Sequence, residues 1–373
     1  MTDEIRTEDE RWMDLALRLA ASAQGQTSPN PLVGAVVVKD GQLIGSGAHL
    51  KAGTPHAEVH ALDMAGDEAK GATLYVTLEP CDHYGKTPPC TEKTIQSGIV
   101  RVVIGSTDPD PRVSGGGIRR LREAGIHVST GILSGPCHRL NEAYFHHRRT
   151  GFPFVTLKTA ITLDGKTAAP TGDSQWVTGE EARIEVHRLR HQHDAVLVGA
   201  GTALADRPRL TVRLAGGGKQ PLRLVVDSRL RMPVDSPLID VKEGPTWVFT
   251  TDAADRKKEE LLKERGLRVF RTGKGPRVDL TSMFGILGEE GIVSVLAESG
   301  GELNASLLRE GWVNKVAFFI APKILGGKES PTAVDGVGPE RMSEALNLTD
   351  VSLSRVGEDF CLTGYPQRER RRQ

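Results

Sequence analysis

The chain has 373 residues, more than a single hydrophobic core usually serves, so two domains are expected. Lysine plus arginine and aspartate plus glutamate both number 48, which gives a formal net charge of zero. A balanced charge excludes a global field that would draw the whole protein to nucleic acid or to an anionic membrane. The expected partners are therefore small molecules, with no nucleic acid and no membrane.

Cysteine content and hydropathy indicate the compartment. Four cysteines are too few for a disulfide framework in a chain of this length, and Cys137 and Cys361 are expected to be packing residues. Residues 1–6 lack the apolar run of a signal peptide, and no later segment approaches the roughly eighteen apolar residues of a membrane-spanning helix. The sequence thus predicts a soluble, cytoplasmic protein.

The first part of the chain predicts helices packed on a sheet. Apolar residues at helical spacing indicate an amphipathic helix over residues 12–23. Two strands, 33–39 and 42–46, lie on either side of Asp40-Gly41, a strong hairpin signal. Further elements are predicted in this order: a helix over 57–65, a strand over 73–78, a helix starting at residue 90, a strand over 100–104, a helix over 115–123 and a strand over 126–128.

The stretch from His56 to Cys90 contains a complete set of ligands for a catalytic zinc ion. One imidazole, His56, and two thiolates, Cys81 and Cys90, match the three protein ligands of an open zinc site, whose fourth position is left for water. Glu58 is not needed as a ligand and is free to carry protons. Each of these residues alone is more often a packing or surface residue, but the complete set favours a metal site.

Helix starts are expected to place these residues. Residues two apart in a helix point to nearly opposite sides, so His56 and Glu58 serve one site only if His56 lies at the helix entrance. Cys90 follows Pro88-Pro89 at another expected helix start, where free backbone N–H groups and the helix dipole favour a thiolate.

The order H-x-E followed by P-C is that of the zinc nucleobase deaminases, in which the glutamate moves protons. The common form continues as C-x-x-C, whereas eight residues separate Cys81 from Cys90 here. That insert, with segments 27–31 and 77–81, resembles the deaminase half of the bifunctional riboflavin-biosynthesis deaminase/reductase family. The resemblance implies a cytidine-deaminase-like helix–sheet sandwich, a deaminase domain at residues 1–147, and Glu58 as its catalytic residue.

Four polar residues are candidates for binding the deaminase substrate. Asn30 lies just before the hairpin, and a loop amide with both donor and acceptor suits a pyrimidine edge. Three residues near the zinc motif are candidates for a substrate phosphate: His49, His83 and Lys86. Each alone is more often a turn residue or a solvated charge, but their shared position around the predicted pocket favours binding.

Residues 141–151 interrupt the apolar pattern and are expected to be a linker between domains. The pair His146-His147 is typical of metal sites, but no second ligand pair is spaced nearby. From Pro153 strands and helices alternate, which predicts a largely parallel, doubly wound sheet with its ligand crevice at the strand carboxyl ends. Thr178 and Glu181 are expected to form a capping box. Strands are predicted over 154–159, 195–198, 222–226, 246–249, 292–296 and 316–320, and helices over 180–190, 257–264 and 305–309.

Two glycine turns follow predicted strands of this second domain. One spans residues 199–202 and the other residues 299–301, just before a helix. Glycine at such points lets backbone N–H groups approach a phosphate. Leu204 stands where the dinucleotide fingerprint G-x-G-x-x-G needs its third glycine, so the first turn is not the standard Rossmann motif.

Several segments resemble the reductase half of the same family, which is dihydrofolate-reductase-like and uses NADPH. These segments are 158–160, 163–166, 174–176, 206–210 and 298–301. The resemblance implies a reductase domain at residues 151–373. Matching positions assign NADPH contacts to Ala160, Trp176, Thr202, Asp206, Gly300, Gly301, Glu302, Leu303, Asn304, Ala305 and Ser306. They assign substrate contacts to Lys158, Ser174, Arg190, Leu210, Arg213 and Glu298, with Asp206 or Lys158 assisting proton delivery.

The resemblance implies two reactions on one substrate, 2,5-diamino-6-(ribosylamino)-4(3H)-pyrimidinone 5′-phosphate. Zinc-dependent hydrolytic deamination comes first, and NADPH then reduces the ribosyl group to ribityl. The resemblance also favours a homo-oligomer formed through the second domain.

Two alternatives stay open. The chain could be a zinc deaminase of free or RNA-borne bases with a binding module as its second domain, or a non-catalytic NADPH- or metabolite-binding regulator. The zero net charge disfavours the first, and the intact Glu58 and ligand set disfavour the second.

Overall fold

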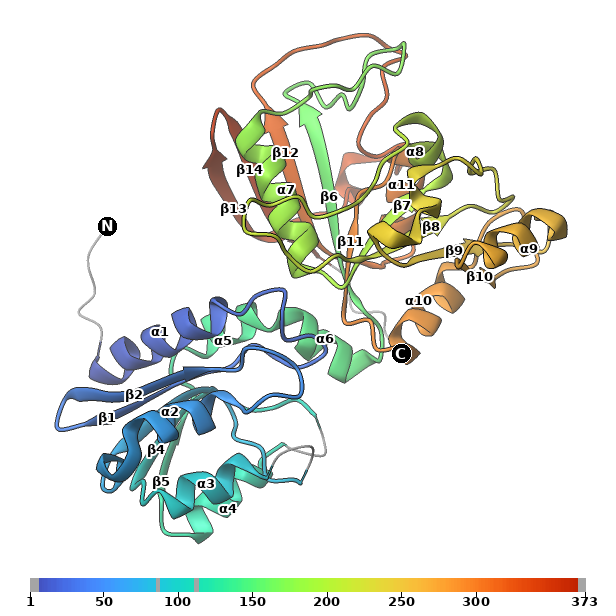
Figure 1. Cartoon of the computed structure of the whole chain (residues 1–373). Helices are drawn as coiled ribbons and strands as arrows, with labels where there is room; N and C mark the ends of the chain where they lie inside the picture. Colours follow the sequence, from blue (N-terminus) through green and yellow to red (C-terminus); the bar gives the residue numbers. More distant parts are fainter. Residues whose placement is uncertain (1–6, 85–87, 111–113, 368–373) are drawn as a thin grey trace. The chain divides into compact units, whose positions relative to one another are not determined.

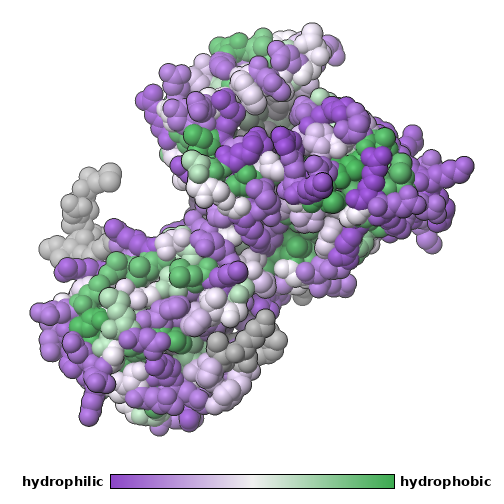
Figure 2. Space-filling model, viewed as in Figure 1, coloured by the Kyte–Doolittle hydropathy of each residue, from purple (hydrophilic) through white to green (hydrophobic). Residues whose placement is uncertain are grey.

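The computed structural model describes residues 7–84, 88–110 and 114–367, so the candidate Lys86 lies outside the described residues. The chain divides into two compact units, Met1–Gly151 and Phe152–Gln373. Within the described residues, every helix is too short or too polar to cross a bilayer. The viewed surface of each unit is mainly hydrophilic and carries smaller, separate hydrophobic areas (Figure 2).

The N-terminal unit is built on a five-stranded sheet in the order β2-β1-β3-β4-β5 (Figure 1). β1 pairs antiparallel with β2 and β3, whereas β3, β4 and β5 are parallel. The hairpin predicted at Asp40-Gly41 is confirmed: both residues have the positive φ, 50° and 72°, that a type I′ turn requires. The strands are β1 (Gly34–Lys39), β2 (Gln42–Ala48), β3 (Thr73–Leu78), β4 (Arg101–Ser106) and β5 (His127–Thr130).

Helices cover both faces of this sheet, as a helix–sheet sandwich requires. On one face α1 (Glu8–Ala21) and α5 (Ser134–Leu140) bury Trp12, Met13 and Cys137 against strand residues. On the other face α2 (Ala57–Ala65), α3 (Cys90–Gln96) and α4 (Gly116–Glu123) close a second apolar cluster. A short 3-10 helix, Gly66–Ala69, follows α2.

Two glycines of β2 set the depth at which α2 lies on the sheet. A Cβ on Gly45 would approach the Ala61 carbonyl oxygen to 2.1 Å, and one on Gly47 would approach the Ala57 carbonyl oxygen to 2.4 Å. Both approaches are to helix backbone, which cannot move aside. These glycines therefore allow close packing of the helix that follows His56 and carries Glu58.

The C-terminal unit contains a nine-stranded sheet in the order β10-β9-β8-β7-β11-β6-β12-β14-β13 (Figure 1). The seven strands from β10 to β12 are parallel, and β14 and β13 add an antiparallel edge. The strands are β6 (Phe154–Thr162), β7 (Ala195–Gly199), β8 (Leu222–Val226), β9 (Thr246–Thr250), β10 (Arg268–Arg271), β11 (Ser294–Ala297), β12 (Val313–Ala321), β13 (Leu348–Val356) and β14 (Asp359–Pro366).

Helices again cover both faces, so the doubly wound architecture is confirmed. α10 (Leu280–Glu289) and α11 (Gly301–Arg309) pack on one face. α7 (Glu180–Gln192), α8 (Ala200–Ala205) and α9 (Arg256–Glu264) pack on the other. The 3-10 helices of this unit are Pro237–Ile239, Val241–Glu243 and Met342–Glu344.

The linker prediction for residues 141–151 is wrong, because this segment forms α6 (Glu142–Thr150). Tyr144 and Phe145 are buried in the core cluster beneath α2 and α4. The side chain of Asn141 fixes the helix start by pairing with both the N–H and the carbonyl oxygen of Leu32, each at 2.8 Å. The polar residues that follow Phe145 made the segment look like a linker, although Tyr144 and Phe145 pack in the core.

The capping box predicted for Thr178 and Glu181 is also wrong. The N-cap of α7 is Gly179, and no side chain of the helix itself caps it. Instead the Gly179 N–H donates to Asp359 Oδ2 at 2.7 Å, from β14 at the antiparallel edge. A tertiary contact from the end of the chain thus replaces the local motif.

Replacing Asp359 with alanine should destabilise the C-terminal unit by about 0.5–2 kcal/mol, because Gly179 loses its acceptor and α7 its cap. Urea unfolding of the full chain, followed by circular dichroism, should show a lower midpoint for this unit. The exposed neighbour offers a matched control, since Glu358→Ala should leave the midpoint in place. Equal midpoints for the two variants would contradict the capping role.

Candidate active sites

The three predicted zinc ligands converge in the N-terminal unit. His56 Nδ1 lies 3.2 Å from Cys90 Sγ and 3.5 Å from Cys81 Sγ, and all three ligand atoms lie within 4.8 Å of one another. A tetrahedral zinc ion bound at about 2.3 Å by sulfur and about 2.0 Å by nitrogen sets such atoms roughly 3.5–3.8 Å apart. The donor set and its spacing therefore fit a zinc ion.

Each ligand comes from the end of a regular element. His56 is the N-cap of α2, with extended backbone, which confirms its predicted place at the helix entrance. Cys81 follows β3, and Cys90 is the first residue of α3, where its N–H donates to Cys81 Sγ at 3.4 Å. Hydrogen bonds from Cys90 and His56 lower the pKa of the Cys81 thiol to about 4, although burial opposes them. A thiolate is the form that binds metal.

Glu58 lies beside the ligands and is almost fully buried, with 3% of its surface exposed. Burial, and then the charge of Cys81, raise the pKa of its carboxyl to about 7. A carboxyl that titrates near neutrality can both take and deliver a proton.

The ligands and Glu58 open onto a pocket of about 450 Å³, a size usual for small-molecule sites. The pocket brings Asn30, His49 and His83 together with the metal site, as expected for substrate contacts. Its described lining comprises Pro29, Asn30, Pro31, Val33, His49, Ala52, Gly53, Thr54, His56, Glu58, Leu78, Glu79, Cys81, His83, Asp108, Asp110, Tyr144 and Arg148.

The structure gives His49 a role other than offering charge. Its ring is 98% buried, and burial lowers its pKa, so the neutral form is favoured. Nδ1 lies 3.2 Å from the Pro55 carbonyl oxygen, which can only accept, so Nδ1 carries the proton. Nε2 is then free to accept from Asn30 Nδ2 at 3.1 Å. This contact fixes the Asn30 amide within the pocket.

Sequence reasoning missed several residues that line this pocket. Asp108 and Asp110 follow β4, whose carboxyl end lies beside that of the parallel strand β3, so the strand pairing could have indicated them. Glu79 accepts from the N–H groups of Asp108, Gly115 and Ile118 at 3.1–3.3 Å, and so connects the end of β4 to the start of α4. Two further lining residues, Tyr144 and Arg148, lie on α6.

In the C-terminal unit a buried carboxylate joins two predicted substrate residues. Arg190 of α7 donates to Glu298 from Nε at 2.6 Å and from Nη2 at 3.0 Å, and Lys158 Nζ of β6 lies 3.4 Å from Glu298 Oε2. Burial raises the pKa of Glu298, but the charges of Arg190 and Lys158 outweigh it and lower the pKa to about 2. Glu298 therefore stays ionised.

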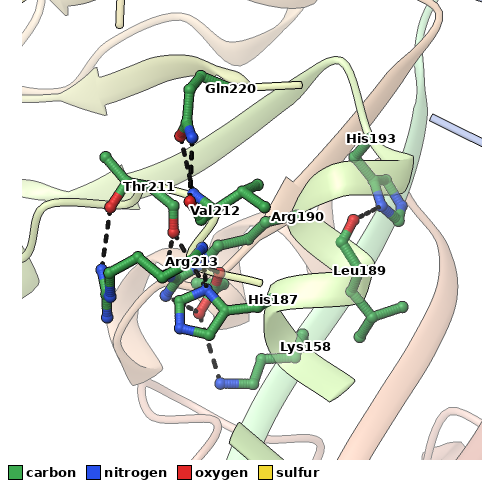
Figure 3. Close-up of polar contacts among 10 residues, drawn as sticks. Lys158, His187, Leu189, Arg190, His193, Thr211, Val212, Arg213 and Gln220 are labelled. Atoms are coloured by element: carbon green, nitrogen blue, oxygen red, sulfur yellow. Dashed lines mark hydrogen bonds and ion pairs between the residues drawn. The ribbon is translucent and has the colours of Figure 1, made fainter. Parts of the chain in front are cut away.

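Arg213 is connected to this cluster through Thr211, by the Thr211 hydroxyl and backbone carbonyl (Figure 3). Arg190 Nη1 donates to the Thr211 carbonyl oxygen at 3.2 Å, and Arg213 Nη1 donates to Thr211 Oγ1 at 2.9 Å. His187, one turn before Arg190, lies 3.1 Å from the same carbonyl oxygen through Nδ1. Burial and the two arginines lower the pKa of His187 to about 4, so it is neutral. Its spacing of three from Arg190 could have revealed it.

The two glycine turns lie next to each other at the ends of β7 and β11. Gly199 and Gly300 are the N-caps of α8 and α11. A Cβ on Gly300 would lie 3.5 Å from Thr202 Oγ1, and one on Gly199 would lie 3.4 Å from Leu303. The starts of α8 and α11 thus lie close together. A helix start offers backbone N–H groups, which suit a phosphate.

The other predicted cofactor and substrate residues lie in several different elements and environments of the C-terminal unit. The amide of Asn304 is occupied by Ser299 and by the Ala333 carbonyl oxygen. Ala160 and Leu210 pack in apolar clusters, whereas Trp176 is 61% exposed beneath the Arg183 guanidinium. Two assigned residues lie near helix ends, Asp206 at the C-cap of α8 and Ser306 in α11, where its hydroxyl bonds to the Glu302 carbonyl oxygen. Ser174 lies half-buried after β6, and Gly301, Glu302 and Ala305 lie in α11.

Comparison with known proteins matches both units. The model of the cytidine and deoxycytidylate deaminase zinc-binding region matches residues 6–106, and that of the RibD C-terminal domain matches residues 153–362. The riboflavin biosynthesis protein RibD of Bacillus amyloliquefaciens is 46% identical over 359 residues, covering 96% of each chain. That of Escherichia coli (strain K12) is 41% identical, covering 95% of this chain and 98% of its own. The chain belongs to the RibD family.

Solved RibD structures agree over the whole length. RibD of Acinetobacter baumannii has a TM-score of 0.88 at 36% identity, covering 97% of this chain and 99% of its own. A diaminohydroxyphosphoribosylaminopyrimidine deaminase/5-amino-6-(5-phosphoribosylamino)uracil reductase of Thermotoga maritima has a TM-score of 0.85 at 36% identity, covering 96% and 99%. The RibD family assignment confirms a deaminase and a reductase of riboflavin biosynthesis, with the zinc site at His56, Cys81 and Cys90. Its reductase half implies a nucleotide cofactor.

Purified protein should contain one zinc ion per chain, because the described residues hold one such ligand group. Cys81→Ser should lose most of the zinc, since a hydroxyl does not replace a thiolate ligand. Cys137→Ser is the matched control, because Cys137 is buried against α1 rather than near His56. Elemental analysis of the three proteins decides the matter, and full zinc in Cys81→Ser would contradict the ligand assignment.

Proposed function

We propose that the N-terminal unit, Met1–Gly151, deaminates 2,5-diamino-6-(ribosylamino)-4(3H)-pyrimidinone 5′-phosphate. The C-terminal unit, Phe152–Gln373, then reduces the ribosyl group with NADPH, giving 5-amino-6-(ribitylamino)uracil 5′-phosphate. The observation that carries the proposal is Glu58 buried beside a complete ligand group in a pocket of small-molecule size. The order of the two steps is supported by the name of the Thermotoga maritima relative, whose reductase substrate is a uracil and therefore already deaminated.

In the deamination, water adds to the ring carbon that bears the amino group, and ammonia leaves. Zinc, held by His56, Cys81 and Cys90, supplies a Lewis acid that makes water a nucleophile at neutral pH. Glu58 takes a proton from the attacking water and delivers protons to the ring nitrogen and to the departing amine. The amide of Asn30, fixed by His49, is available to hold the pyrimidine edge.

In the reduction, hydride is delivered to C1′ of the sugar, and NADPH supplies it. The paired helix starts at Gly199 and Gly300 are the proposed place for the cofactor phosphates. Lys158, Arg190 and Arg213 converge around Glu298 and Thr211, and can position the sugar and its phosphate. Glu298 holds the two cations in place rather than moving a proton, because it remains ionised.

The two competing functions have less support. Burying a carboxyl group costs folding free energy, and a buried carboxyl with a pKa near 7 is typical of catalytic sites. A non-catalytic regulator does not require such a group. A binding module does not require the partly buried cluster of Lys158, Arg190 and Glu298 at the carboxyl ends of parallel strands.

We also infer that the protein forms a homo-oligomer through its C-terminal unit. The edge strand β13 exposes apolar side chains, with Val351 at 52% and Leu353 at 62%. An apolar edge strand presents unpaired backbone groups and pairs readily with another chain.

Glu58→Gln should separate the two activities. The change keeps the size of the side chain and the zinc ligands, but removes the group that moves protons, so deamination should fall by about 10²–10⁴-fold. Zinc content should stay normal. NADPH oxidation should persist with the already deaminated ribosylamino-uracil phosphate and should be almost absent with the diamino precursor.

Ammonia release and NADPH absorbance measure the two steps separately. Retained deamination would remove Glu58 from its proposed role. Loss of both activities with both substrates, in a folded and zinc-loaded variant, would contradict two independent sites.

Gly300→Val should weaken NADPH binding without unfolding the protein. Gly300 has φ −75°, which any residue adopts, and its added Cβ would make only an ordinary contact with Thr202. The branched side chain would instead fill the space above the α11 helix start. Titration of NADPH by fluorescence measures the dissociation constant. Gly275→Val, at a position with nothing within 4 Å, is the control, and equal affinities would contradict the cofactor placement.

A further inference from the structure

We propose that Arg148 binds the 5′-phosphate of the deaminase substrate. The inference rests on the proposed function, because the phosphate is a property of that substrate. In this proposal α6, which follows the deaminase sheet in the chain, supplies a residue that contacts the deaminase substrate.

The pocket is rich in carboxyl groups, so a substrate phosphate that binds there needs a positively charged side chain beside it. Four carboxyl groups lie among its described lining residues, from Glu58, Glu79, Asp108 and Asp110. Within that described lining, Arg148 is the one lysine or arginine side chain. A phosphate monoester carries a charge of about −1.5 to −2 at neutral pH, and such a dianion requires a cationic partner when it leaves water.

Two of the three lining histidines already have other contacts, and His83 remains a candidate phosphate contact beside Arg148. His49 Nε2 is used to hold the Asn30 amide, and its Nδ1 contacts the Pro55 carbonyl oxygen. His56 is a zinc ligand. An arginine, by contrast, is charged at all relevant pH values and offers five N–H donors in a planar fork that matches phosphate oxygens.

Packing holds Arg148 in place without using up its donors. Tyr144 lies one helical turn earlier, and the Arg148 guanidinium lies 5.2 Å from the centre of its ring. Arg148 Nη1 is 3.8 Å from Asp110 Oδ2, longer than the 2.7–2.9 Å typical of a strong charge-assisted hydrogen bond. The Nε atom of Arg148 is buried and has no hydrogen-bond partner among the described residues. Donors of the guanidinium thus remain for a ligand.

The same helix supports a second part of the pocket wall. The Tyr144 hydroxyl donates to the Asp108 carboxyl at 3.2 Å. Asp108 follows the carboxyl end of β4, next to the carboxyl end of β3, which leads to the zinc ligand Cys81. Tyr144 is 92% buried and anchored in the core cluster. Arg148 is therefore held at a fixed place relative to the wall of the pocket.

The test compares two substrates in the zinc-loaded full-length protein: the diaminopyrimidine ribosyl 5′-phosphate and the same compound without its phosphate. Arg148→Gln should lower kcat/KM for the phosphorylated substrate roughly 10- to 100-fold, mainly through KM, since a hydrogen-bonded charge pair is lost. Deamination of the dephosphorylated compound should be unchanged. The ratio of the two kcat/KM values is a readout that a merely structural role would not move.

Arg149 provides the matched control. It lies on the same helix and stacks over Phe145 at 5.7 Å, outside the pocket lining. Arg149→Gln should leave both substrates unaffected. Arg148→Lys keeps the charge but not the fork, and should raise KM for the phosphorylated substrate by only a few-fold.

Each result decides for or against the assignment. An equal loss on both substrates, or no loss on either, would overturn the phosphate role of Arg148. If Arg148→Gln does not fold, the lysine variant applies the same criterion. Failure of the wild-type protein to deaminate the phosphorylated substrate would overturn the proposed function itself, and Arg148 with it.

Discussion

The parallel pairing of β3 with β4 is the constraint on which the deaminase site depends. Parallel strands end at the same edge of a sheet, so the segment 79–81 after β3 and the segment 107–110 after β4 lie side by side. Glu79 strengthens this edge by accepting three backbone N–H groups from the second segment and from the start of α4. With the edge fixed, the starts of α2 and α3 need only bring His56 and Cys90 to Cys81.

The C-terminal unit repeats this arrangement with different chemistry. The adjacent parallel strands β7 and β11 end in the turns that start α8 and α11, and Glu298 directly follows β11. β6 lies on the other side of β11 and brings Lys158 to the same carboxylate. In both units, therefore, the reactive groups are gathered by strand order, while the helices supply N–H groups or single side chains.

Sequence reasoning succeeded where the decisive signal is local. The zinc ligands, the helix start at His56 and the hairpin at Asp40-Gly41 each follow from neighbouring residues and from chain-independent chemistry. The expectation of two domains followed from the length of the chain, and the doubly wound sheet of the second domain followed from its alternation of strands and helices. The roles of individual cofactor and substrate residues in the second domain rested on resemblance and remain predictions.

The secondary-structure predictions that were wrong or missing have a common physical cause. At these positions tertiary contacts, rather than the local sequence pattern, determine the structure. α6 was read as a linker because its polar run conceals the anchor made by Tyr144 and Phe145. β13 was missed because its alternation of apolar and polar residues is short, Val351 to Ser354, and most of its side chains are exposed. Asp359 caps α7 from 180 residues away in the chain, which no local motif can reveal.

The two buried glutamates show how environment assigns chemical roles. Glu58 and Glu298 are both withdrawn from water, which alone raises the pKa of a carboxyl. Glu298 is paired with Arg190 and Lys158, and its pKa falls to about 2, so it cannot exchange a proton at neutral pH. Glu58 has no lysine or arginine partner among its described contacts, and its pKa rises to about 7. Two identical side chains thus differ near neutral pH: Glu298 is a fixed anion, whereas Glu58 is able to exchange a proton. The proton needed in the reduction must therefore come from a group other than Glu298.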